Sequence, residues 1–215
     1  MSLPDNVCSS APVAGPYIGP RALPVTGLVD YEHGGVAIQD PSRGLAFQTW
    51  RARVIGEGIY LSAPNTSEFL AYQASAEITE VSLAFDQNMR PTIAFVEGGR
   101  AKLLWYDSAI PGETVTELAA GVITPRVALD DKRQSQLGIS DIILAYLRDG
   151  SLYYRQQRDR FLVEIDPTAD MPEEEREAAR AQVAASGGLI KIGMNRQFRL
   201  QFMLAYGTSA STSSA

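Results

Sequence analysis

The chain has little of the chemistry that most catalytic and metal sites use. Its 215 residues include one cysteine, Cys8, and one histidine, His33. A single cysteine excludes an internal disulfide and a zinc site built from several thiolates, and a single histidine excludes histidine-rich metal sites. We expect Cys8 to be an unreactive thiol. We expect His33 to be a turn residue rather than a catalytic one, because no serine lies in the sequence context of an activated nucleophile.

Basic residues and long apolar runs are also scarce. Lys and Arg number 19 against 25 Asp and Glu, which gives a net charge of −6. Nonspecific nucleic-acid binding needs clustered cations to displace counterions, so we predict no direct contact with nucleic acid. No run approaches the roughly 18 apolar residues of a membrane span. The N-terminal segment lacks a basic region followed by an apolar one, so we also expect no secretory signal.

Proline, glycine and serine concentrate at the two ends of the chain. Residues 1–34 carry prolines at positions 4, 12, 16, 20 and 24, and proline fixes φ and removes backbone donors. We therefore predict an extended N-terminal arm at 1–34, a β body at 35–206 and a flexible tail at 207–215. The arm and the tail are expected to reach onto partner molecules.

The body has the pattern of short strands separated by turns. Apolar and polar residues alternate over Glu80–Asp86, which is typical of a half-buried strand, and Asp149-Gly150 between two β-rich runs is a strong hairpin signal. One helix is expected near 171–185, where acidic residues would face the positive helix end on a solvated surface element. We predict strands at 36–38, 45–53, 58–62, 69–73, 80–86, 114–118, 126–130, 142–147, 151–158, 161–165, 189–192 and 198–206, and a hairpin over 92–107.

Two segments, 80–108 and 125–159, repeat each other with a period of roughly 45 to 50 residues, as in propeller blades and related β-meander arrays. Ala84-Phe85-Asp86 matches Ala128-Leu129-Asp130, Gly98-Gly99 matches Asp149-Gly150, and Trp105-Tyr106 is matched with Tyr153-Tyr154. Residues 36–62 are interpreted as a third, degenerate copy. The predicted fold is mainly β: repeated antiparallel hairpins or meanders that form a partial-propeller-like or β-sandwich body, with one surface helix.

Two acidic residues, Asp86 and Asp130, leave strands at equivalent places in the repeat. A glycosidase needs two carboxylates facing each other across a sugar, and this pair is the one candidate for a hydrolase. Duplication explains the pair better, because Asp at a strand exit caps the following turn. Asp86-Gln87-Asn88 also lacks the remaining spacing of a calcium loop. We therefore expect no enzyme activity, no cofactor and no metal.

The densest charge cluster follows the second hairpin and contains three arginines near Asp159 and Glu164. Three interpretations remain open for it: a salt-bridge network, a contact with carbohydrate or another anion, and a subunit interface, where Arg and Tyr are enriched. The nearby aromatic residues either fill the core or line a sugar-binding face. The candidate interface comprises Trp105, Tyr153, Tyr154, Arg155, Arg158 and Arg160.

Several segments resemble tailed-bacteriophage virion proteins. They are VSLAFDQNMRP at 81–91, LDDKR at 129–133, SDIILAY at 140–146, YRQQRDR at 154–160, IGMN at 192–195 and RLQF at 199–202. The resemblance covers the body from 35 to 206, with the helix near 171–185 as a local insertion.

The resemblance implies a structural component of a phage tail that links tail proteins or anchors a fibre or spike. It implies other tail proteins and further copies of this chain as partners, and a place in the virion tail after assembly in the bacterial host cytoplasm. The family has no catalytic residues to carry over. The alternative function is a receptor- or carbohydrate-binding module of the virion, using the face around Trp105, Tyr153 and Arg155.

Overall fold

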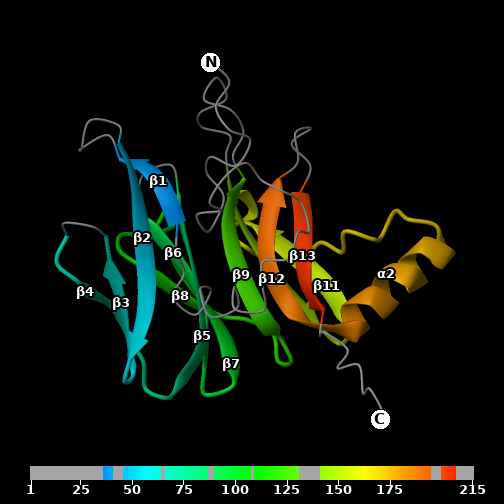
Figure 1. Cartoon of the computed structure of the whole chain (residues 1–215), viewed down its shortest axis with the longest axis horizontal. Helices are drawn as coiled ribbons and strands as arrows, with labels where there is room; N and C mark the ends of the chain where they lie inside the picture. Colours follow the sequence, from blue (N-terminus) through cyan, green and yellow to red (C-terminus); the bar gives the residue numbers. More distant parts are fainter. Residues whose placement is uncertain are drawn as a thin grey trace, which may run out of the picture.

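In the described part of the chain the fold consists of four antiparallel β-sheets and one α-helix (Figure 1). The computed structural model describes residues 36–40, 46–63, 66–86, 90–107, 109–130, 141–194 and 200–206. Cys8, His33 and the predicted arm and tail lie outside the described residues. The mainly β fold predicted from the sequence is confirmed.

Each sheet is a meander in which strands that are consecutive in the chain pair with one another. The first sheet contains β1 (Val36–Asp40), β2 (Ala46–Ile55), β3 (Gly58–Ser62) and β4 (Phe69–Gln73). The second sheet contains β5 (Ile78–Phe85), β6 (Pro91–Glu97), β7 (Arg100–Trp105) and β8 (Thr114–Glu117). The third sheet contains β9 (Ile123–Asp130), β10 (Asp141–Arg148) and β11 (Ser151–Gln156), and the fourth contains β12 (Ser186–Met194) and β13 (Leu200–Tyr206).

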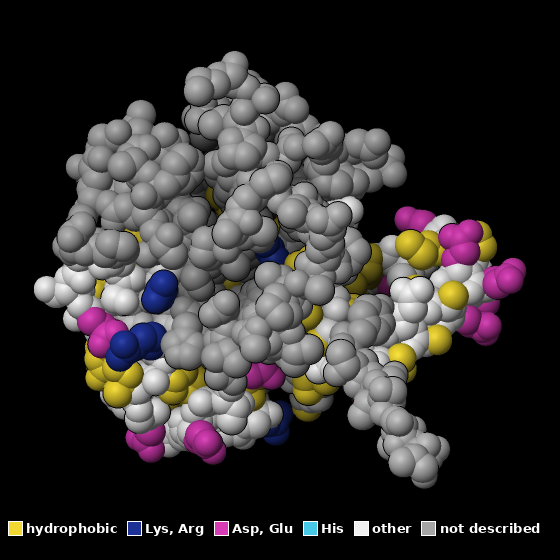
Figure 2. Space-filling model, viewed as in Figure 1, with side chains coloured by type: hydrophobic (Ala, Val, Ile, Leu, Met, Phe, Trp, Pro, Cys, Tyr) yellow, Lys and Arg dark blue, Asp and Glu magenta, His cyan; other side chains and the backbone are white. Residues whose placement is uncertain are grey.

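The helix α2 (Glu173–Ala185) lies between the third and fourth sheets in the chain and stands out from the body (Figures 1 and 2). Only Val183 of this helix is buried, so the surface helix expected near 171–185 is confirmed. It begins at Glu173, with Pro172 at the N-cap and acidic residues in the first turn, where the helix dipole favours them. Within the described part of the chain, no helix is long and apolar enough to span a bilayer.

Neighbouring sheets pack face to face through three apolar cores. Ile59 and Leu61 of the first sheet meet Leu83 and Phe95 of the second. A second core joins the second and third sheets, and a third core joins the third and fourth sheets and takes in Val183 of α2. Because the second and third sheets are covered on both faces, their strands are near-continuous apolar runs, as in AFVE and IILAYL.

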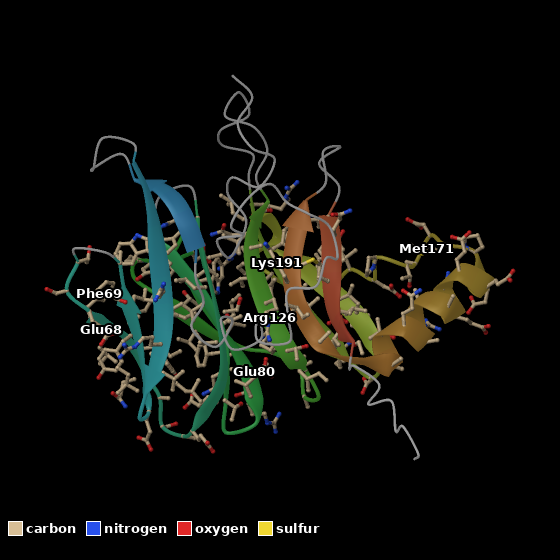
Figure 3. The ribbon with its side chains drawn as sticks, in the orientation of Figure 1. Glu68, Phe69, Glu80, Arg126, Met171 and Lys191 are labelled. Atoms are coloured by element: carbon tan, nitrogen blue, oxygen red, sulfur yellow. The ribbon has the colours of Figure 1, made fainter. Side chains whose placement is uncertain are left out.

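One arginine ties together the first strands of the second, third and fourth sheets. Arg126 of β9 is buried; its Nη1 donates to Glu80 Oε2 on β5 at 2.8 Å, and its Nε donates to the carbonyl oxygen of Ile190 on β12 at 3.2 Å. Beside this contact, the amide of Val127 donates to Ser82 Oγ at 3.1 Å. Figure 3 shows Glu80 and Arg126 together between β5 and β9. These bonds fix the relative positions of three sheets that no backbone ladder joins.

The two predicted repeat segments form matching meanders, β5–β6–β7 and β9–β10–β11. Their hairpins have the same turn conformation: φ is 55° and 75° at Gly98 and Gly99, and 52° and 72° at Asp149 and Gly150. Positive φ at both central positions gives the turn the twist that antiparallel strands need. Glycine adopts positive φ without a steric clash, so Asp149 is the one of these four residues for which the conformation is sterically unfavourable.

The alignment predicted for the third strand of the repeat is wrong. Trp105-Tyr106 was matched with Tyr153-Tyr154, but Phe95 pairs with Lys102 in β7, whereas Tyr146 pairs with Tyr153 in β11. Counted from the shared turn, Tyr153 therefore corresponds to Lys102. The physical reason is that the turn fixes the register, whereas the aromatic residues lie at different distances from it.

The strand predicted at 161–165 is also wrong, and β11 ends at Gln156 rather than at Arg158. A short 3₁₀ helix, η3 (Gln157–Asp159), follows β11. The segment after η3 contributes one isolated bridge, between Ile165 and Tyr154. The composition of this segment, FLVEI, favours a strand, but the burial of Phe161 in the core holds the backbone in another conformation.

A buried glutamate connects the first and second sheets. Glu97, at the end of β6, accepts hydrogen bonds from Tyr72 Oη at 2.9 Å, Ser75 N at 2.8 Å and Lys102 Nζ at 2.8 Å. Burial alone would raise the pKa of Glu97, but the bonds from Lys102 and Ser75 outweigh it and lower the pKa to about 2. The carboxylate is therefore ionised in the folded protein well below the pH at which an ordinary glutamate takes up its proton.

This contact makes stability depend on pH in a defined window. The folded-state pKa of Glu97 lies below the ordinary value, so its contribution is complete above about pH 4.5 and is lost as the pH falls toward about 2. The shift corresponds to about 3 kcal/mol. We expect Glu97→Gln to lower the free energy of unfolding at pH 7 and to flatten its decline between about pH 4.5 and 2 in urea titrations. Glu174→Gln, which changes an exposed glutamate on α2, is the control and should keep the wild-type slope.

Candidate functional site

The candidate site is the corner that follows β11, residues Gln157–Ile165. After η3, two consecutive non-glycine residues adopt the left-handed conformation, Arg160 with φ 53° and Phe161 with φ 56°. Each such residue costs about 1 kcal/mol or more unless its surroundings hold it. Backbone bonds close the turn, from Phe161 N to the carbonyl of Gln156 at 2.9 Å and from Leu162 N to that of Asp159 at 3.0 Å. The corner is thus a tightly wound segment that other contacts must stabilise.

The first of these contacts is the burial of Phe161. Its side chain is 2% exposed and lies in the core between the second and third sheets. Its ring stands edge-on to Trp105, with the centroids 5.1 Å apart. In addition, Arg155 Nη1 donates to the carbonyl oxygen of Phe161 at 3.0 Å. A strand through Phe161 would break this packing, because it would turn the ring away from Trp105.

The second contact is a network centred on the carboxylate of Glu164. Arg148 binds it in a bidentate manner, Nη2 to Oε1 at 2.5 Å and Nη1 to Oε2 at 2.8 Å. Arg155 Nη2 donates to Oε2 at 3.2 Å, and the hydroxyl of Tyr146 donates to the same oxygen. Arg155 Nε in turn donates to the Tyr146 hydroxyl oxygen at 2.7 Å. One carboxylate therefore fastens the corner to both β10 and β11.

The protonation states in this network follow from burial and hydrogen bonding. Burial, together with the hydrogen bond to Glu164, raises the pKa of Tyr146 to about 12, so its hydroxyl remains a donor at physiological pH. Burial would raise the pKa of Glu164, but the bonds from Arg148, Tyr146 and Arg155 outweigh it and hold the pKa below its ordinary value. The carboxylate is consequently charged at neutral pH.

The two remaining arginines of the run also bind acidic partners. Arg158 Nε donates to Asp141 Oδ2 at 2.6 Å, and Asp141 also accepts the backbone amide of Arg158. Arg160 Nη2 lies 2.5 Å from Asp107 Oδ2, which connects the corner to the second sheet. A salt-bridge network is thus present. Glu164 was among the acids expected from the sequence, whereas Asp107 and Asp141 come from distant parts of the chain.

The corner displays apolar rather than charged side chains at its tip. Leu162 is 75% exposed and Val163 is 52% exposed. They lie between Phe161, which is anchored in the core, and Glu164, which is held by the network. The two neighbouring aliphatic side chains are therefore exposed to solvent on a backbone that is held in place on both sides.

The six residues of the candidate interface are divided by the structure between the core and the corner. Trp105 is 4% exposed and donates its indole N–H to Thr116 Oγ1 at 3.2 Å, so no ligand can stack on it in this structure. Tyr153 lies under the guanidinium of Arg148, 4.8 Å from its ring centroid, and Tyr154 packs against Phe202 of the fourth sheet. Arg155 is held inside the network, whereas Arg158 and Arg160 are half-exposed.

The sequence reasoning missed the residues that matter most here. Leu162 and Val163 were assigned to a strand, and Glu164 was counted as one charge of a cluster rather than as its centre. A partial signal was available, namely an apolar pair next to a run of charges. What the sequence does not show is which apolar residue is buried.

The two acidic residues considered as a catalytic pair are Asp86 and Asp130, and Asp86 has a structural role. Asp86 accepts the backbone amide of Arg90 at 2.9 Å and its Nε at 2.8 Å, so it caps the turn as expected. The side chain of Asp130 lies outside the described part. Among the described residues, no group of three or more His, Cys, Asp or Glu is placed to hold a metal ion.

The chain was compared with protein families, curated proteins and solved structures. No protein-family model, no curated protein and no solved structure matches the chain.

The network predicts a specific effect of Glu164→Gln. Loss of the carboxylate charge removes the anionic partner of Arg155 and leaves Arg148 only the exposed Asp149, at 3.7 Å. We expect this loss to cost about 1–3 kcal/mol in urea unfolding at pH 7. Because the corner depends on this residue, hydrogen exchange of the Phe161 and Leu162 amides should rise more than that of the β10 amides. Glu174→Gln, at an exposed position on α2, should change neither measurement. Equal acceleration at all these amides would show that the network does not hold the corner locally.

Proposed function

We propose that the chain is a structural component of a bacteriophage tail, which binds a neighbouring tail protein through Leu162 and Val163. The observation that carries the proposal concerns the YRQQRDR segment, one of those that resemble phage virion proteins. Its three arginines each bind an acid within the chain, and the corner that they brace presents two exposed aliphatic residues.

The physical argument is one of preorganisation. A binding surface costs less to order when its side chains are already fixed. Removing exposed apolar side chains from water adds a favourable hydrophobic contribution to binding. The corner meets both conditions, because its backbone is anchored on either side of the displayed pair. Arg158 and Arg160 precede this pair in the chain, and their half-exposed guanidinium groups suit the polar rim of a contact.

The strand edges support a contact through side chains rather than strand addition. The register between β3 and β4 shifts at Ile59–Tyr60, β8 is four residues long and bounded by acidic residues, and the edge of β11 meets Ile165. Bulges, short strands and charges are the features that keep sheet edges from pairing with other chains. A partner is therefore better accommodated at the corner than along these edges.

The proposal predicts that Leu162→Ser with Val163→Ser blocks assembly without unfolding the chain. Both side chains are exposed, so the free energy of unfolding should stay within about 0.5 kcal/mol per substitution. Incorporation into phage particles, measured by quantitative blotting of purified virions made with the variant, should fall at least tenfold, which corresponds to about 1.4 kcal/mol of binding.

The matched control is Val115→Ser, which removes an exposed aliphatic side chain from β8 and should be incorporated normally. Normal incorporation of the double variant would contradict the proposed role of the corner. Absence of the wild-type chain from purified particles would contradict the proposed function itself.

A further inference from the structure

The outer face of the first sheet differs from the face that the fold buries. Ala52, Ile59 and Leu61 point toward the second sheet and are fully buried. The alternate positions of the same strands point the other way. On β2, β3 and β4 these outward residues are Arg51, Arg53, Ile55, Tyr60 and Leu70, which we call the outer face.

The centre of the outer face is apolar. Ile55 is 43% exposed and Leu70 is 46% exposed, and Tyr60 lies between them, paired with Leu70 across the strands. The ring of Tyr60 leans over Gly58: a Cβ added to Gly58 would be 2.6 Å from Tyr60 Cε2 and 3.0 Å from Leu70 Cδ1. Because Gly58 has no side chain, the Tyr60 ring can lie flat against the sheet at this position. Ile55 pairs with Gly58 from the neighbouring strand, so the three apolar side chains form one patch.

The edge of the patch carries charges of both signs. Arg51 and Arg53 lie beside it on β2, and Arg53 Nε is 3.4 Å from Glu68 Oε1, ahead of β4. In Figure 2, hydrophobic side chains gather over β2–β4, at the left of the molecule, next to Lys/Arg and Asp/Glu side chains. An apolar centre with a polar rim is the usual composition of a protein interface.

We propose that this face binds the same face of a second copy of the chain across a two-fold axis. Two observations select a second copy. First, Arg53 and Glu68 form a partly exposed ion pair on this face, so a two-fold axis can bring the two copies of the pair together with each arginine opposite the partner's glutamate, which is the self-complementarity that an isologous interface requires. Second, the contact continues the packing already used in the fold, where the inner face of the first sheet and both faces of the second and third are covered by another sheet.

The expected strength follows from the size of the face. Strands β2–β4 with about 4.8 Å between strands and about 3.3 Å per residue cover only a few hundred Å². Stable complexes bury about 800 Å² per partner. The dimer should therefore be weak, with a dissociation constant on the order of 10 μM. The contact rests on the geometry of this sheet and does not require the proposed tail function.

The experiment is sedimentation velocity on the purified full chain over roughly 1–200 μM, a range centred on the expected dissociation constant. The wild type should pass from monomer to dimer. Leu70→Asp, which places a charge at the apolar centre, should remain monomeric at the highest concentration. The matched control is Val115→Asp, a charge at an exposed aliphatic residue of β8, which should dimerise as the wild type does.

A charge exchange tests the symmetry of the contact. Arg53→Glu and Glu68→Arg should each weaken the dimer at least tenfold, because each places like charges together across the axis. Mixing the two single variants should restore the dimer as a heterodimer, in which opposite charges meet across the axis although the pair within each chain is lost. Circular dichroism should show that each variant is folded. A wild type that stays monomeric over the whole range would overturn the proposal, as would a dimer that Leu70→Asp leaves unchanged or a mixture of the two single variants that does not dimerise.

Discussion

The corner after β11 depends on the carboxylate of Glu164. Two guanidinium groups, Arg148 and Arg155, and the hydroxyl of Tyr146 converge on it from two neighbouring strands. Partly buried cations need an anionic partner, since an unpaired charge costs several kcal/mol where water is scarce. The sharp turn after η3 brings Glu164 to them. The positive φ values of Arg160 and Phe161 are therefore held by this network together with the burial of Phe161.

The stack of sheets gives this corner its rigid base. Phe161 fills a place between the second and third sheets, and these sheets are held by the apolar core and by the bond between Arg126 and Glu80. The chain therefore uses its arginines in two ways: Arg126 fixes sheets relative to one another, and the arginines near the corner fix a loop on them. Leu162 and Val163 remain outside both arrangements, and this is why they are available to a partner.

Local patterns predicted most of the strands. Strand β3 at 58–62 and strand β4 at 69–73 have the expected bounds, because alternation and the flanking turns are properties of neighbouring residues. The turn conformation shared by Gly98-Gly99 and Asp149-Gly150 was likewise visible as a sequence match. The three-residue error in aligning Tyr153 shows that matching aromatic residues is weaker evidence than matching turns.

The corner could not be predicted in the same way, because its partners are far apart in the sequence. Asp107 meets Arg160, Asp141 meets Arg158, and Phe161 meets Trp105, contacts that form only once the sheets have stacked. Local composition favoured a strand at 161–165, and tertiary packing overrode it. The arginine run was recognised as a candidate site, but the displayed residues were those next to it.

A reconstruction of an intact particle that contains this chain would show directly what the corner contacts. We expect Leu162 and Val163 to lie within about 4 Å of apolar atoms of a neighbouring virion protein, with the corner in the conformation described. A reconstruction in which the chain is built into the tail with both side chains facing solvent would contradict it.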